Sequence, residues 1–286
     1  MRTAVRLNRV DMLQCIAELR ELDPSWQWER NLMADALSSF RRDLRVLDWL
    51  YQHLPQSSRT VYHQQFRVCA SRGDVTAIRW LCEHDYAVGT STADSAANSR
   101  QLEVLAYLYE HTTVRCSSNG VCEAASNGNI EVLELILVDQ PQETNAIDGA
   151  ANGGRLSIVK YLHDHLTSGC TKRAMDSAAM IGRLDIVKFL HENRTEGCTT
   201  NAMNVTEFGR LEALRFLHEN RNEGCTARAL EAAAANNHLE VMEFLCAHRH
   251  ECDYGSAMVS AAASGQVTAL QFLLKYPDAR ASAYLA

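Results

Sequence analysis

One phrase recurs along most of this chain at a nearly constant interval, and the repetition limits the fold more than any other feature. A small or polar residue precedes each helix that begins x-Leu or x-Val, and the interval between these marker residues is 26 to 28 residues. The markers are Gly73, Arg100, Gly128, Gly154, Gly182, Gly209, Asn237 and Gly265. A fixed period of this kind indicates stacked repeats. We predict an array of eight regular repeats over residues 61–286, continuous with irregular helical repeats that form a cap over residues 1–60.

Each repeat contains two short helices, as the copy that begins at Ala174 illustrates. Its first helix carries small apolar residues with an i, i+4 spacing, which places them on one stripe: Ala174, Met175, Ala178 and Ala179. Gly182 then ends the helix, because glycine adopts a left-handed backbone without steric cost. The second helix presents its own apolar stripe: Leu184, Ile186, Val187, Phe189 and Leu190. Such a pair buries its apolar faces only by stacking on its neighbours.

Three repeats depart from this pattern. Arg100 and Asn237 occupy the glycine position, and arginine tolerates a left-handed backbone less well than asparagine does. The repeat that ends at Gly209 lacks one residue in its first helix and has Val205 and Thr206 in place of the alanine pair. We therefore expect a locally distorted first helix before Gly209.

The repeated phrase resembles the core of the ankyrin repeat. The copies AAMIGRLDIVKFLHEN from Ala178, AASNGNIEVLELIL from Ala124 and AAANNHLEVMEFLC from Ala233 share the pattern A-A-x-x-G-x-L-x-x-V-x-x-L-L. The T-P-L-H opening of ankyrin repeats is missing, and the unit is shorter than the usual ~33 residues. The chain is similar in this respect to the shortened ankyrin arrays of oomycete genomes. The resemblance implies an all-α solenoid with reduced or absent β-hairpin fingers.

Composition and motifs argue against several classes of function. The net charge is −7, which disfavours a nucleic-acid or anionic-membrane binder, and no apolar stretch reaches the length of a membrane helix. Neither a glycine-rich phosphate loop nor a catalytic H-E-x-x-H or G-x-S-x-G motif occurs, so we expect no enzyme activity and no cofactor. The ten cysteines include no C-x-x-C pair. We expect them to be reduced in a cytoplasmic monomer, with a nuclear location as the alternative.

Two groups of residues raise the question of metal or pH chemistry. Cys246, His248, His250 and Cys252 have ligand types that suit zinc, but the repeat frame already accounts for both cysteines. A zinc site there is the less favoured interpretation, and we predict no metal. The histidines at the ends of the second helices are His163, His191 and His218. We expect them to bond the free carbonyls of their helices.

The resemblance also implies a binding surface. In ankyrin proteins the two residues between Ala-Ala and Gly face the partner, and in this chain large apolar residues stand there in two adjacent repeats. The predicted contacts are Met180, Ile181, Glu207, Phe208, Asn152 and Asn236, with Arg183 and Arg210 as a basic rim. Phe208 has the alternative of turning inward to fill the gap left by the deletion. The expected function is a non-catalytic scaffold or adaptor that binds a protein partner. The alternative, suggested by the abrupt C-terminus, is a regulatory or targeting arm of a larger multidomain protein such as a kinase or ligase.

Overall fold

The computed structural model describes residues 1–22, 28–39, 43–139, 145–166, 169–204, 209–250 and 252–276. These residues contain twenty α-helices, one 3-10 helix at Gln56–Ser58 and no β-strand. The all-α fold class predicted from the repeat pattern is confirmed for this part of the chain. Among the described helices, none has the length and apolar character needed to span a bilayer.

The helices alternate between the first and the second member of a pair. The earlier helices are α1 (Arg2–Arg6), α2 (Val10–Leu22), α3 (Leu32–Ser38), α4 (Leu44–His53), α5 (His63–Ser71), α6 (Val75–Glu83), α7 (Thr90–Asn98), α8 (Leu102–His111), α9 (Ser118–Asn127) and α10 (Ile130–Asp139). The later helices are α11 (Asn145–Asn152), α12 (Leu156–His165), α13 (Lys172–Met180), α14 (Leu184–Asn193), α15 (Asn201–Asn204), α16 (Leu211–Asn220), α17 (Arg228–Ala235), α18 (Leu239–His248), α19 (Tyr254–Ala263) and α20 (Val267–Leu273).

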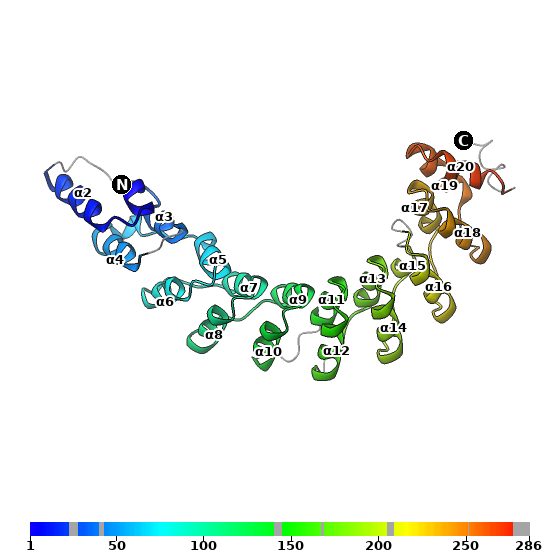
Figure 1. The fold of residues 1–286 in the computed structure, drawn as a ribbon, viewed down its shortest axis with the longest axis horizontal. Helices are drawn as coiled ribbons and strands as arrows, with labels where there is room; N and C mark the ends of the chain where they lie inside the picture. Colours follow the sequence, from blue (N-terminus) through cyan, green and yellow to red (C-terminus); the bar gives the residue numbers. More distant parts are fainter. Residues whose placement is uncertain are drawn as a thin grey trace. The chain divides into compact units, whose positions relative to one another are not determined.

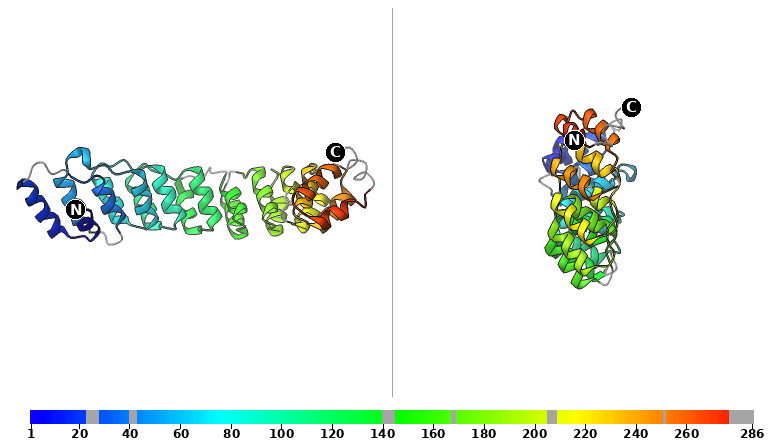
Figure 2. Two further views of the ribbon diagram at one scale, coloured as in Figure 1. Left: turned by 90° about the horizontal axis from the view of Figure 1, so that it is seen from above. Right: turned by 90° about the vertical axis from the view of Figure 1, so that its right-hand side faces the viewer.

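The chain divides into two compact units. Unit 1 comprises Met1–Ala124 with Glu131–Asp139, and unit 2 comprises Ala125–Ile130 with Gln140–Ala286. In unit 2 each first helix packs on the next, from α11 through α13, α15 and α17 to α19, and the second helices α12, α14 and α16 follow the same order. In unit 1, α5 packs on α7 and α6 on α8. Figure 1 shows the two rows of helices within each unit, and Figure 2 shows the helices of a row side by side.

A left-handed residue lies shortly before the second helix of every regular repeat. All eight marker residues have φ between 59° and 78°, including the two that are not glycine, Arg100 and Asn237. At Gly182 the amide donates to the Ala179 carbonyl and the next amide, that of Arg183, donates to the Ala178 carbonyl. This pair of backbone hydrogen bonds is a Schellman motif, which satisfies carbonyls at the end of the helix. The positions predicted for the left-handed turn are therefore confirmed.

Alanine forms the buried face of the first helices. Ala174, Ala178 and Ala179 are fully buried, and Met175 beside them is nearly so, which confirms the predicted stripe. On the second helix the buried residues are Ile186, Val187 and Leu190, while Leu184 and Phe189 are only half-buried. The second stripe is thus narrower than predicted, because Leu184 lies at the beginning of α14, where it has fewer neighbours.

The first helix pair uses the same turn as the regular repeats. Asn8 has φ 53°, and it follows the buried residues Ala4 and Val5 as Gly182 follows Ala178 and Ala179. Near this end, the ring of Trp28 lies edge-on to that of Trp49, with 6.1 Å between their centroids. Trp26 lies outside the described residues. The irregular helical cap over residues 1–60 and the eight regular repeats of one continuous solenoid over residues 61–286 stay predictions.

Half-buried ion pairs fix the short connectors that follow the second helices in unit 2. Arg194 pairs with Glu196 at 2.6 Å, and Arg221 pairs with Glu223. Glu196 also accepts a bond of 3.0 Å from the amide of Cys170, which belongs to the preceding repeat. These side-chain bonds occupy the place where ankyrin proteins carry a finger, and the described connectors contain no strand.

The prediction that His163 and His191 bond the carbonyls at their helix ends was wrong. Instead, each ring meets the next repeat edge-on, His163 against Phe189 and His191 against Phe216, with 5.5 Å between centroids in both cases. The ring of His218 meets Phe244 in the same way. The carbonyl bonds are made by another set, in which each histidine stacks on an aromatic ring one turn earlier: His53, His84, His111, His165 and His248. The histidines that bond carbonyls stand two positions later in the repeat than His163 and His191, as His165 does on the same helix as His163.

The cysteines of the connectors are largely buried. Cys198 and Cys225 are buried, whereas Cys170 and Cys252 are half-buried. Burial raises the pKa of the Cys170 and Cys198 thiols to about 12, so both remain protonated at neutral pH. In the described part of the chain, the side chains of Cys246, His248, His250 and Cys252 do not come together as a metal-binding group.

Candidate protein-binding groove

A recurring side-chain bond aligns the first helices with one another. Two residues before the alanine pair, Asp176 on α13 accepts bonds from the amide of Thr199 at 2.8 Å and from its hydroxyl at 2.7 Å. Thr199 belongs to the segment that leads into the next first helix. The same link joins Asp94 to Ser117, Asp148 to Thr171 and Asn204 to Thr226. These links fix the register between successive repeats, in a chain whose repeats lack the T-P-L-H motif.

Asp148 is the most buried acid of this series, with only 7% of its surface exposed. Burial raises the pKa of its carboxyl group, and the hydrogen bonds from the Thr171 hydroxyl and amide oppose that rise. Asn204 makes the equivalent link with a neutral amide oxygen, at 2.9 Å from the Thr226 nitrogen. The link therefore requires an acceptor rather than a charge.

The residue after each left-handed turn covers the turn of the preceding repeat. Arg183 lies over Gly154 and donates to its carbonyl oxygen, and Arg210 lies over Gly182. Ile181 also packs on Gly154. Arg183 makes a second contact, an ion pair of 2.7 Å with Asp185. The predicted basic rim is thus formed of residues that also hold neighbouring repeats together.

The first helices of unit 2 line a groove with a volume of about 640 Å³. It runs across α13, α15, α17 and α19 and takes its lining from the helix face opposite to the buried alanine stripe. The lining residues are Arg173, Asp176, Ser177, Met180, Asn201, Asn204, Arg228, Glu231, Ala232, Ala235 and Ser260. α15 has only four residues, whereas α13 has nine and α17 has eight.

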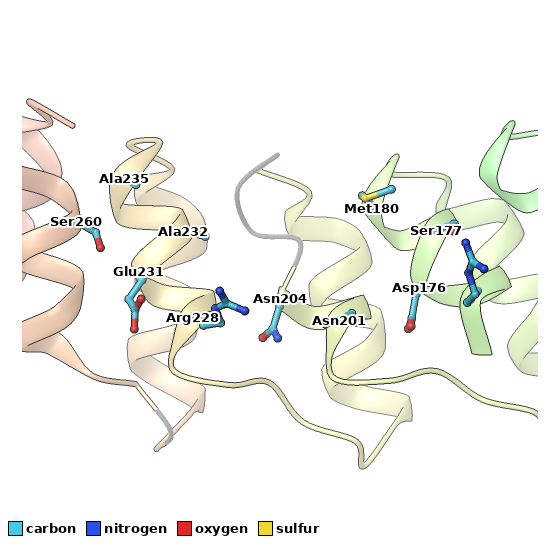
Figure 3. Close-up of a pocket in the computed structure, with 11 residues that line it drawn as sticks. Asp176, Ser177, Met180, Asn201, Asn204, Arg228, Glu231, Ala232, Ala235 and Ser260 are labelled. Carbon is cyan, nitrogen blue, oxygen red and sulfur yellow. The ribbon is translucent and has the colours of Figure 1, made fainter. Parts of the chain in front are cut away.

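The groove has a polar side and an apolar side, and both sides run across the helices. Figure 3 shows Met180 and Ala235 toward one side and Asn204 and Arg228 toward the other. Met180 is 36% exposed and is one of several large apolar side chains that reach the surface in the described residues. The helical spacing explains the arrangement, because residues three or four apart share a face and the polar positions precede Met180 and Ala235 by one or two turns.

Several polar side chains of the groove have no partner within the described residues. Neither Arg173 nor Arg228 makes a side-chain hydrogen bond or ion pair there, and both are exposed. Asn201 and Glu231 are likewise without a side-chain bond in the described chain. By contrast, Asp176 and Asn204 are engaged with the next repeat. Among the described residues the groove therefore offers two guanidinium groups, an amide and one carboxylate without a side-chain hydrogen bond, and the charge of Arg173 also acts on the Asp148 carboxyl, whose pKa it lowers.

Among the predicted contact residues that the structure describes, Met180 is the one that lines the groove. Asn152 and Asn236 are exposed at the same helical position of other repeats, and the Asn236 amide donates to the Ala232 carbonyl at 3.0 Å. Ile181 is half-buried. Glu207 and Phe208 lie outside the described residues. All of these remain predictions as partner contacts.

Sequence reasoning missed most of the groove because it considered only the last turn of each first helix. Arg173, Ser177 and Met180 share one face with an i, i+4, i+7 spacing, and Arg228, Ala232 and Ala235 repeat it two units later. Extending the helical period from Met180 toward the helix start identifies these positions. Which of them are free of intramolecular bonds depends on the neighbouring repeat and is not visible in the spacing.

The architecture defines a helical repeat protein with a lined groove on its row of first helices. Comparison with family models supports this class: the model for ankyrin repeats in three copies matches residues 202–283, and that for ankyrin repeats in many copies matches residues 147–191. A search of curated proteins found no match. Residues 147–191 and 202–283 are therefore ankyrin repeats, as the resemblance implied. Ankyrin repeats are generally modules of protein–protein interaction.

Proposed function

We propose that this chain is a non-catalytic scaffold or adaptor that binds a segment of a partner protein in the groove lined by α13, α15, α17 and α19. The observation that carries the proposal is the exposed Met180 beside polar side chains that have no bonding partner in the described residues. Adjacent apolar and unsatisfied polar groups are typical of a surface completed by another molecule. In this proposal the chain acts as a monomer in the cytoplasm, or alternatively in the nucleus.

The chemistry of the lining supports binding over catalysis. The described residues that line the groove include no histidine, cysteine or lysine, and its Asp176 is engaged with Thr199. A general base must be able to approach the proton that it removes. Glu231 alone would have to serve as the general base, and the lining serines Ser177 and Ser260 have no histidine in the described lining to activate them.

The test compares Met180→Glu with Val138→Glu in capture experiments. Val138 is 82% exposed on α10 in unit 1, so it provides an equal change of charge outside the groove. We expect a partner captured by the wild type to be lost with Met180→Glu and kept with Val138→Glu, both variants retaining their helical circular dichroism. Equal capture by all three proteins would show that the groove is not the binding site.

A further inference from the structure

The groove presents its free cations in a regular row. Arg173 on α13 and Arg228 on α17 occupy the same position of their repeats, directly before the first alanine of the buried stripe, and Asn201 on α15 stands at that position between them. All three side chains are exposed and without a bond to other described residues. A cation, an amide and a second cation therefore line the groove, one from each of three successive first helices.

The two arginines stand where a helix is least favourable for them. Each belongs to the first turn of its helix, where unsatisfied backbone N–H groups create a positive potential and a basic residue costs roughly 0.3–1 kcal/mol. The first helices α5, α7, α9, α11, α15 and α19 carry neither arginine nor lysine in their first turn. An anion bound at this row would reverse that cost.

From this row we infer the chemistry of the partner: an extended peptide segment with two carboxylate side chains about five residues apart, one for Arg173 and one for Arg228. The inference rests on the function proposed above and adds the identity of the ligand class. The backbone of the segment passes Asn201, whose amide both donates to and accepts from a peptide group. An apolar side chain of the segment reaches Met180.

The spacing follows from the repeat. Neighbouring first helices stand about 9 Å apart, so the Cα atoms of Arg173 and Arg228 are roughly 18 Å apart. An extended chain advances ~3.3 Å per residue, and about five residues cover that length. A helical segment would need about twelve residues at 1.5 Å each. An acidic side chain at either position gains a charge-assisted bond of the strong, bidentate kind that arginine favours.

The charge pattern also selects against other ligands. Glu231 lies one turn beyond Arg228 and has no bond to other described residues, so it repels a uniformly anionic chain such as a nucleic acid. A peptide avoids this repulsion, because it places a neutral or basic residue there. The row thus discriminates by the order of charges rather than by net charge.

The experiment is a selection of random peptides of about twelve residues, displayed on phage, against the full chain and against Arg173→Glu/Arg228→Glu. We expect wild type to enrich peptides with two Asp or Glu residues four to six positions apart. We expect the double variant to enrich basic pairs at the same spacing. For a synthetic copy of an enriched peptide, Arg173→Gln and Arg228→Gln should each weaken binding about tenfold, while Arg79→Gln on α6 should leave binding unchanged.

The possible failures are distinct. Peptides that depend on Met180 but carry no acidic pair would overturn this inference and leave the groove as the binding site. Peptides that bind Met180→Glu as well as wild type would refute both. Binding of a single-stranded oligonucleotide that competes with the selected peptides would assign the row to nucleic acid and also overturn the inference. Circular dichroism of each variant separates these outcomes from misfolding.

Discussion

Replacing Asp148 tests whether the side-chain links between repeats contribute as acceptors or as charges. In Asp148→Ala the amide and hydroxyl of Thr171 both lose their acceptor, at 2.9 and 2.5 Å. Each lost bond costs about 1–1.5 kcal/mol in such settings. Burial of the carboxylate opposes part of this, as its raised pKa indicates. We expect a net loss of about 2 kcal/mol in the free energy of unfolding, equivalent to roughly 4–8 °C in Tm.

Asp148→Asn is the matched control, because Asn204 makes the same link naturally. We expect it to stay within about 0.5 kcal/mol of wild type at pH 7. Since the folded pKa of Asp148 lies above its ordinary value of 3.8, the folded state holds the proton more tightly. Wild type should therefore lose stability relative to Asp148→Asn as the pH rises from about 4 through the folded pKa.

Urea denaturation followed by circular dichroism, at several pH values, measures these differences. The reasoning is refuted if Asn destabilises as much as Ala, since the charge would then be essential. It is equally refuted if Asp148→Ala changes the stability by less than about 0.5 kcal/mol. Fitting each transition with a model of sequential repeats avoids assuming a single cooperative step.

Two further predictions concern close approach and acid stability. A Cβ at Gly153 would stand 2.1 Å from the backbone oxygen of Ser126, so we expect Gly153→Ala to cost about 2–3 kcal/mol in a denaturant titration, and an unchanged midpoint would contradict the packing described. The bond from Arg221 lowers the pKa of Glu223 to about 2, so the stability from this pair is complete above about pH 4.5 and is lost as the pH falls toward 2. Comparing the free energies of unfolding of wild type and Glu223→Gln at pH 7 and pH 3 should show a difference of about 1 kcal/mol at pH 7 that narrows in acid, and a constant difference would exclude this titration.

The turns and the packing faces within one repeat can be predicted from the sequence, whereas the contacts between repeats cannot. Gly182 and Asn237 indicate a left-handed turn, because both residue types tolerate that conformation. Ala178 indicates close helix packing, because its side chain is small. The link from Asp176 to Thr199 joins residues 23 positions apart, and neither residue type alone specifies the pair. His163 was misassigned for the same reason, because its environment is set by Phe189 in the following repeat.

The groove shows the same difference between features that the sequence predicts and contacts that only the fold determines. Met180 was predicted from an apolar residue at a position that usually faces solvent, and the structure places it in the lining. Arg183 was predicted to face a partner, yet its guanidinium bonds to Gly154 and Asp185. No sequence pattern singled out Arg173 as a contact residue. Its proposed role in binding depends on the absence of a hydrogen-bonding partner for its side chain among the described residues. Freedom from intramolecular bonds is a property of the fold and not of the residue.

The links between repeats also bear on how such a chain can grow. A repeat such as that of α13 and α14 carries the acceptor Asp176 for the link that follows it and the donor Thr171 for the link that precedes it. A tandem duplication that preserves the repeat boundaries supplies both halves of each new junction at once. The segments that the sequences from Ala174 and from Ala202 share, FLHENR and EGCT, are what such a duplication leaves behind. Lengthening the array requires no compensating substitution, so the number of repeats is free to change under selection for the partner.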